Sequence, residues 1–157
     1  MRLMSIAALI GELQRVDDNT AVNPDMLRSL VKEKKVKYIY HGDSLRINAD
    51  QFPIDMNNLF GLDPSMEMPR IRSIHNAFLA VRESNPELGI SEQRIRRLVG
   101  MGKLPHIRIG NRAYVALESF APPYNECLLY DDYRNSEEAK LEQIALRQLA
   151  RGRKRRH

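Results

Sequence analysis

The chain has one cysteine, no tryptophan and few other aromatic residues among its 157 positions. Because Cys127 is alone, an intramolecular disulfide and a cage of several thiolates around a metal ion are both excluded. The apolar run near the start of the chain, Ile6–Ile10, is too short for a membrane span or a signal peptide. We therefore expect a cytoplasmic protein with no membrane segment, held together by its hydrophobic core.

The sequence also lacks a catalytic or cofactor-binding pattern. Residues 100–102 (Gly-Met-Gly) are not followed by the Lys and Ser/Thr of a phosphate-binding loop. The adjacent acids at 131–132 and 137–138 are more typical of a solvated turn or a helix start than of a two-metal site. The four histidines do not have the spacing of metal ligands: His41, His75, His106 and His157. We predict no enzyme, no metal and no cofactor.

Charge is distributed unevenly along the chain. The net charge is +5 and the pI is about 9.5, which permits a polyanionic partner. Residues 1–68 carry a net charge of −2, residues 69–122 carry +5 and residues 123–157 carry +2. The middle segment therefore holds the surface that is electrostatically best suited to phosphates.

An internal repeat emerges when the sequence is shifted by 68 residues. Residues 2–52 then align with residues 70–120 without a gap. The ten identical pairs are Arg2/Arg70, Ser5/Ser73, Ile6/Ile74, Arg28/Arg96, Leu30/Leu98, Val31/Val99, Lys35/Lys103, Ile39/Ile107, Gly42/Gly110 and Phe52/Phe120. Because apolar positions, a turn glycine and a closing Phe all match in register, we infer a duplication.

Each copy predicts two helices followed by a β-hairpin. The first helix has apolar residues at i, i+3, i+4 and i+7, and the second begins at a capping residue, Asn23 or Ser91. In the second copy that helix should stop at Gly102. The apolar period then changes to two around a Gly-Asn or Gly-Asp turn, which indicates a hairpin.

The predicted fold class is mainly α with small β-hairpins. We expect two tandem winged helix-turn-helix units, repeat 1 over residues 1–53 and repeat 2 over residues 70–122. Residues 54–69 would form a connector that either crosses a core or packs on it, and residues 123–157 would form a C-terminal helix and a basic tail. The tail helix should start near Ser136, and its apolar stripe should pack within the chain. That stripe is Leu141, Ile144, Ala145 and Leu149.

The second helix of repeat 2 carries side chains suited to a DNA groove. If Ile95, Leu98 and Val99 face the core, Gln93 and Arg97 point away from it, and Arg94 and Arg96 lie on the flanks. Arg pairs with guanine and Gln with adenine in the major groove. The hairpin of repeat 2 adds three residues suited to a minor groove. These are Arg108, Asn111 and Arg112.

Residues 89–120 resemble the winged helix-turn-helix modules of the excisionase type, relatives of the MerR DNA-binding domain. The resemblance lies in Arg96–Leu98, Gly102–Pro105, Gly110–Arg112 and Glu118–Phe120. It implies that the second helix enters the major groove of double-stranded DNA while the hairpin touches the minor groove or the backbone. By this resemblance Gln93, Arg94 and Arg97 would contact the major groove, and Arg96 and Lys103 would contact phosphates. The wing contacts would come from Arg108, Asn111 and Arg112.

Two other basic segments leave alternatives open. Repeat 1 has lysines at 32, 34, 35 and 37, which either contact the DNA backbone or, as we favour, complement the dipole of the preceding helix. The basic tail is either a DNA-wrapping arm, as we favour, or a solvated terminus. The tail residues concerned are Arg151, Arg153, Lys154, Arg155 and Arg156.

The leading functional hypothesis is a nucleoid-associated DNA-binding protein in which repeat 2 reads a site. By resemblance, it would direct excisive recombination or regulate transcription, with a recombinase or the transcription machinery as a further partner. The alternative is a protein-interaction adaptor built on degenerate winged-helix repeats, with net-acidic repeat 1 as its contact surface. The sequence leaves the target site and the oligomeric state open.

Overall fold

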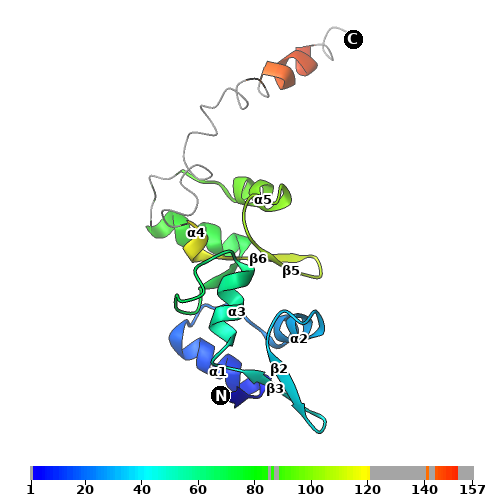
Figure 1. Cartoon of the computed structure of the whole chain (residues 1–157). Helices are drawn as coiled ribbons and strands as arrows, with labels where there is room; N and C mark the ends of the chain where they lie inside the picture. The colour runs from blue at the N-terminus through cyan, green and yellow to red at the C-terminus, as the bar shows by residue number, and fades with distance from the viewer. Residues whose placement is uncertain (1, 85, 87–88, 121–140, 142–143, 152–157) are drawn as a thin grey trace.

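The computed structural model describes residues 2–84, 86, 89–120, 141 and 144–151. It is a mixed α/β structure with two small antiparallel sheets of three strands each among these residues (Figure 1). The elements of the first half are β1 (Leu3–Met4), α1 (Ile6–Val16), α2 (Pro24–Lys32), β2 (Tyr38–His41), β3 (Ser44–Asn48) and α3 (Phe52–Leu59). Those of the second half are β4 (Ile71–Ser73), α4 (Ile74–Ser84), α5 (Glu92–Gly100), β5 (Ile107–Ile109), β6 (Arg112–Ala116) and the 3₁₀ helix η2 (Leu117–Phe120).

Apart from α3 and η2, the two halves have corresponding elements at the offset found in the sequence. Helices α1 and α4, helices α2 and α5, and strands β3 and β6 have bounds that differ by 68 residues. The sheet orders, β1-β3-β2 and β4-β6-β5, correspond strand by strand. Both predicted hairpins are confirmed: Ile39 pairs with Arg46, and Ile107 pairs with Tyr114.

Capping side chains begin the second helix of each half, as predicted. The side chain of Asn23 accepts a hydrogen bond from the backbone N–H of Met26 at 2.8 Å, and Ser91 accepts from Arg94 at 3.1 Å. Such bonds satisfy N–H groups that have no partner inside the helix. Gly102 follows the end of α5 with a φ of +69°, which confirms the predicted stop.

A short third strand completes each sheet, and the sequence pattern does not predict it. Strand β1 pairs with β3, and β4 pairs with β6. An arginine just before the strand anchors it, because Arg2 Nε donates to Asp50 Oδ1 at 3.1 Å and Arg70 Nε donates to Glu118 Oε1 at 2.8 Å. The same kind of pair therefore closes both sheets.

The first part of the expected connector, residues 54–69, is helical. Helix α3 begins at Phe52, crosses the expected boundary after residue 53 and ends at Leu59. Pro53 lies in its first turn, where a missing backbone N–H costs nothing. Met56, Phe60 and Leu62 are buried, so this segment packs on the core as the sequence suggests.

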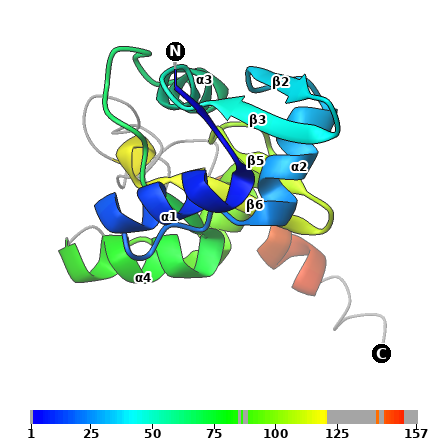
Figure 2. The ribbon, with the colours of Figure 1, turned by 90° about the horizontal axis from the view of Figure 1, so that it is seen from below.

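The two halves share one hydrophobic core. The larger buried cluster consists mainly of residues from repeat 1 and α3, and it also contains Ile71, Ile107 and Tyr114 from repeat 2. A backbone hydrogen bond joins Ala21 N–H to Ile71 O at 2.9 Å. Seen along the long axis, α1 and α4 lie on one side and α2 with the two hairpins lies on the other (Figure 2).

A two-bond ion pair also crosses the junction. The guanidinium of Arg72 donates to both carboxylate oxygens of Asp17 at 2.6 and 2.7 Å, and to the carbonyl of Ile71 at 2.9 Å. Arg72 is 7% exposed, so these bonds compensate the loss of its hydration. Burial raises the pKa of Asp17, but the hydrogen bonds and charge of Arg72 outweigh burial and hold that pKa below its ordinary value.

The apolar stripe near the C-terminus does not pack as expected. Residues 144–151 are helical, and Leu141, Ile144, Ala145 and Leu149 are all exposed. The prediction of intramolecular packing is therefore wrong for these side chains, because helical periodicity shows an apolar face without showing what covers it. The expected helix start at Ser136 lies outside the described residues. No helix in the described part of the chain is long and apolar enough to cross a membrane.

Candidate nucleic-acid interface

Helix α5 buries one face and exposes a cationic one. Its buried residues are Ile95, Leu98 and Val99, as the apolar spacing predicts. Gln93, Arg96 and Arg97 are exposed, while Arg94 on the flank is half-buried. The burial of the helix therefore matches the predicted helical wheel, with Arg94 less accessible than the other three polar residues.

The hairpin of repeat 2 exposes its three predicted side chains. Arg108 is on β5 opposite Ala113, and Arg112 begins β6 opposite Ile109. Gly110 opens the turn with a φ of +61°, a conformation that favours glycine, and Asn111 follows it at the exposed tip. Two guanidinium groups and one amide thus surround the tip of the hairpin.

Glu92 holds one of the cationic side chains near the start of α5. Its carboxylate lies 3.6 Å from a guanidinium nitrogen of Arg96 and 2.7 Å from Nδ1 of His75 on α4. Neither contact is among the sequence predictions, although the four-residue spacing of Glu92 and Arg96 is a usual signal for a pair on one helix face. No ion pair among the described residues involves Arg97, Arg108 or Arg112, so their charges are available to a ligand.

Lys103 follows the end of α5, next to the glycine that ends it. Its backbone N–H donates to the carbonyl of Leu98 at 2.9 Å, which fixes the chain as it leaves the helix. The Lys103 side chain is exposed. Seven of the eight residues predicted for repeat 2 are therefore exposed on α5, on the turn after it and on the hairpin.

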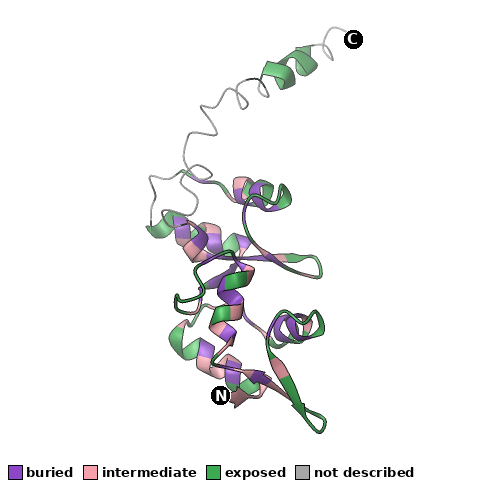
Figure 3. Ribbon diagram, viewed as in Figure 1, coloured by how far each residue is buried: buried purple, intermediate pink, exposed green. Residues whose placement is uncertain are grey.

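These elements lie on one side of the molecule. Helix α5 and the β5–β6 hairpin project from the same side, and exposed residues lie on the outer part of α5 and at the hairpin tips (Figures 1 and 3). The same side carries α2 and the β2–β3 hairpin of repeat 1. A continuous edge of the protein is thus made from two helices and two hairpins.

The corresponding surface of repeat 1 has different chemistry. Asp25 and Ser29 occupy the positions of Gln93 and Arg97, and Asp25 lies 3.4 Å from Arg28 in an ion pair. Tyr40, in the position of Arg108, is 59% exposed and packs edge-on against Tyr38. The base-reading side chains predicted in repeat 2 therefore have no cationic or amide counterparts at these three positions.

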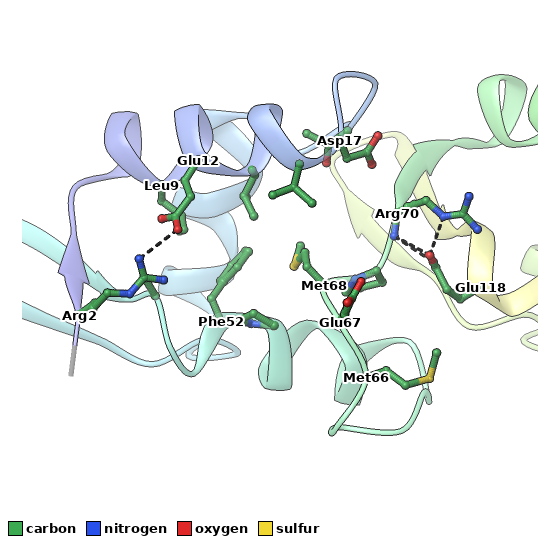
Figure 4. Close-up of a pocket in the computed structure, with 16 residues that line it drawn as sticks. Arg2, Leu9, Glu12, Asp17, Phe52, Met66, Glu67, Met68, Arg70 and Glu118 are labelled. Atoms are coloured by element: carbon green, nitrogen blue, oxygen red, sulfur yellow. Dashed lines mark hydrogen bonds and ion pairs between the residues drawn. The ribbon is translucent and has the colours of Figure 1, made fainter.

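A cavity of about 550 Å³ lies at the junction of the repeats (Figure 4). Leu9, Phe52 and Met68 contribute apolar walls. Its rim holds charged groups that are already paired with one another, Arg2 with Glu12 at 3.0 Å and Arg70 with Glu118 at 2.8 Å. The volume suits a small molecule, but the Arg70–Glu118 pair is explained by sheet closure and Arg2 is already paired with Glu12, so we assign the functional surface to the cationic edge.

The remaining candidate residues lie near the C-terminus. Cys127, the acidic pairs at 131–132 and 137–138, and the tail residues Arg153, Lys154, Arg155 and Arg156 lie outside the described residues. Arg151 is exposed at the end of the helical segment 144–151. Within the described ranges no group of three or more His, Cys, Asp or Glu residues could hold a metal ion.

Comparisons with known proteins found no matching family model, no matching curated protein and no matching solved structure.

Proposed function

We propose that this protein binds double-stranded DNA through repeat 2, with α5 in the major groove and the β5–β6 hairpin against the adjacent minor groove or backbone. Gln93 and Arg97 would contact base edges, with Arg94 at the edge of the groove. Arg96 and Lys103 would contact phosphates, and Arg108, Asn111 and Arg112 would form the wing contact. Each repeat would then be a winged helix-turn-helix unit.

The observation that carries the proposal is the joint exposure of α5 and the hairpin on one cationic edge. Segment 69–122 holds a net charge of +5, and Arg97, Arg108 and Arg112 are exposed there. Arg70 and Arg72 of the same segment, by contrast, are paired with Glu118 and Asp17. An edge of accessible guanidinium groups is instead suited to a polyanion.

The biological role that accompanies this proposal follows from the resemblance of residues 89–120. We place the protein with architectural factors that direct excisive recombination, and transcription regulation is the second role within the same class. A recombinase or the transcription machinery would then share the DNA, and the protein would be nucleoid-associated.

A salt titration tests DNA binding directly. Fluorescence anisotropy with a labelled mixed-sequence duplex of about 30 base pairs, roughly three helical turns, should show binding at low salt. The affinity should then fall steeply, with a log–log slope of about −0.9 for each phosphate contacted. Absence of binding at low salt would contradict the proposal.

One feature of repeat 1 favours the adaptor as a second candidate. A groove of about 470 Å³ lies between α1, α2 and the β2–β3 hairpin, lined by Ile6, Val31, Tyr40 and Leu45 with Arg28 and Lys32 beside them. Exposed aromatic side chains beside a groove are common in protein interfaces. A chain that binds no duplex would favour this second function.

A further inference from the structure

Repeat 1 keeps the cations that contact phosphate in the proposed function and has lost those that read bases. Arg96 and Lys103, the two predicted phosphate contacts of repeat 2, have identical counterparts in Arg28 and Lys35. The predicted groove and wing contacts at six positions are all replaced. The replaced pairs are Gln93/Asp25, Arg94/Met26, Arg97/Ser29, Arg108/Tyr40, Asn111/Asp43 and Arg112/Ser44.

The retained cations lie at equivalent points of the backbone. Helices α2 and α5 have matching bounds, so Arg28 and Arg96 have the same place on their helices. Lys35 donates its backbone N–H to Leu30 O at 2.9 Å, the same bond that Lys103 makes with Leu98. The side chains of Arg28 and Lys35 are 65% and 45% exposed. Both are accessible to a phosphate.

The junction fixes the two units so that both present this surface on the same side. The shared core, the Ala21–Ile71 hydrogen bond and the Asp17–Arg72 ion pair hold the two halves together. Along one side of the molecule, α5, the β5–β6 hairpin, α2 and the β2–β3 hairpin follow one another (Figure 1). A duplex lying along this side would meet both repeats in the same orientation.

We propose that repeat 1 docks on the backbone of the duplex that repeat 2 reads, with Arg28 and Lys35 contacting phosphates. This inference rests on the proposed function of repeat 2. Repeat 1 adds affinity and lengthens the site but contributes no sequence preference, because phosphate contacts carry no base information. Since the units follow one another in the same orientation, the site is asymmetric, not palindromic.

Existing ion pairs do not prevent this contact. Arg28 lies 3.4 Å from Asp25, and Lys35 lies 2.9 Å from Glu33, in pairs that are exposed to solvent. Because exposed pairs of this kind are weak and screened by water, a phosphate can replace the carboxylate at little cost. The neighbouring lysines at 32, 34 and 37 are exposed as well and raise the local positive potential.

The test compares two double variants with equal loss of charge. Arg28→Gln with Lys35→Gln removes the proposed contacts. Arg15→Gln with Arg82→Gln removes two exposed cations from the last turns of α1 and α4, on the other side of the molecule. Each is titrated by anisotropy against a mixed-sequence duplex of about 30 base pairs and one of about 12 base pairs, roughly one helical turn, over a salt series.

The expected result is specific to the first variant and to the long duplex. Its log–log salt slope should become shallower by about 1.8, which is about 0.9 for each of the two phosphates that are no longer neutralised, while the control variant keeps the wild-type slope. Its discrimination between a selected site and a scrambled site should be unchanged. Circular dichroism melting verifies that both variants fold.

Failure of this inference is distinguishable from failure of the proposed function. If the wild type and Arg28→Gln/Lys35→Gln have equal slopes on the long duplex while Arg97→Ala weakens binding, only the role of repeat 1 is overturned. A loss of sequence discrimination in the repeat 1 variant would also overturn it. If the wild type binds no duplex, both proposals fall.

Discussion

The two repeats share a backbone and differ on their surfaces. Helices α1 and α4 have matching bounds, and the same kind of arginine–acid pair closes both sheets. On the outer face of the second helix, however, Asp25 and Ser29 stand where repeat 2 has Gln93 and Arg97. The identical apolar residues mark what the fold needs, and we propose that the identical pairs Arg28/Arg96 and Lys35/Lys103 mark a shared phosphate contact. The replaced residues mark where we propose that the two copies have different contacts.

The burial of one identical pair differs between the copies. Phe52 is fully buried in the shared core, whereas Phe120 is only partly buried against the smaller cluster of repeat 2. Phe52→Ala should lower the free energy of unfolding by about 3–5 kcal/mol, since it leaves a cavity in the core. Phe120→Ala should cost about 1–2 kcal/mol, because less area returns to water. Urea denaturation measures both losses, and equal values would contradict the difference in burial between the two positions.

The junction between the copies should depend on the Asp17–Arg72 pair. Asp17→Asn leaves a guanidinium that is 7% exposed without its countercharge, so we expect a loss of about 2–3 kcal/mol in unfolding free energy, measured by urea denaturation. The control is Asp18→Asn at the neighbouring exposed position, which should cost under about 0.5 kcal/mol. Similar losses in the two variants would show that the pair does not stabilise the junction.

The same pair gives the protein a defined response to acid. The pKa of Asp17 is held below its ordinary value of 3.8 in the folded chain. The stabilisation that the ionised Asp17 carboxylate gives the fold is therefore fully present above pH 3.8. This stabilisation is lost as the pH falls through the folded pKa. The stability difference between wild type and Asp17→Asn should therefore shrink below pH 3.8. A difference that grows on acidification would contradict this account.

Equivalent positions on the second helices should respond differently in DNA binding. Arg97→Ala should weaken binding to a selected site by about 1–3 kcal/mol if the guanidinium contacts a base. Ser29→Ala, at the matching position of repeat 1, should leave the affinity unchanged, and Asp25→Ala should not weaken it. Anisotropy titration of the three variants measures this contrast. Equal losses of DNA affinity from Arg97→Ala and Ser29→Ala would contradict a functional difference between α2 and α5.

The smallest expected effect concerns how the second helix ends in each copy. Lys34 has a φ of +57°, and its counterpart Gly102 has a φ of +69°. Positive φ strains a residue with a Cβ atom but not glycine. Lys34→Gly should therefore stabilise the fold by about 0.5 kcal/mol, and Gly102→Ala should destabilise it by about 1 kcal/mol. Thermal melting checks the opposite signs, and two changes of the same sign would contradict the equivalence of the two turns.

Much of the fold is predictable because each helix and hairpin has a local pattern. Caps at Asn23 and Ser91, the stop at Gly102 and the change of apolar period are visible directly in the sequence. The internal repeat shows the cap and the change of period twice. Strands β1 and β4 are not predictable from the sequence, because two or three residues are too few to show the alternation of polar and apolar residues that marks a strand. Helix α3 is not predicted because Pro53 suggests a break, whereas proline is well accommodated in a first helical turn.

Contacts between distant segments are beyond a sequence pattern. Asp17 and Arg72 are 55 positions apart and come from different repeats, so no periodicity joins them. The wheel of α5 is predictable because three apolar residues define its buried face. It does not show that Arg94 is half-buried or that His75 on α4 contacts Glu92, since both depend on how the helices pack.

The central claim is that the exposed face of α5 and the β5–β6 hairpin reads a DNA sequence. Selection from a pool of random duplexes, carried out with the wild type and with Arg97→Ala/Arg112→Ala, tests it most directly. We predict that the wild type enriches one asymmetric site and that the double variant, although folded, enriches none. Enrichment of the same site by both proteins, or of no site by the wild type, would contradict the claim.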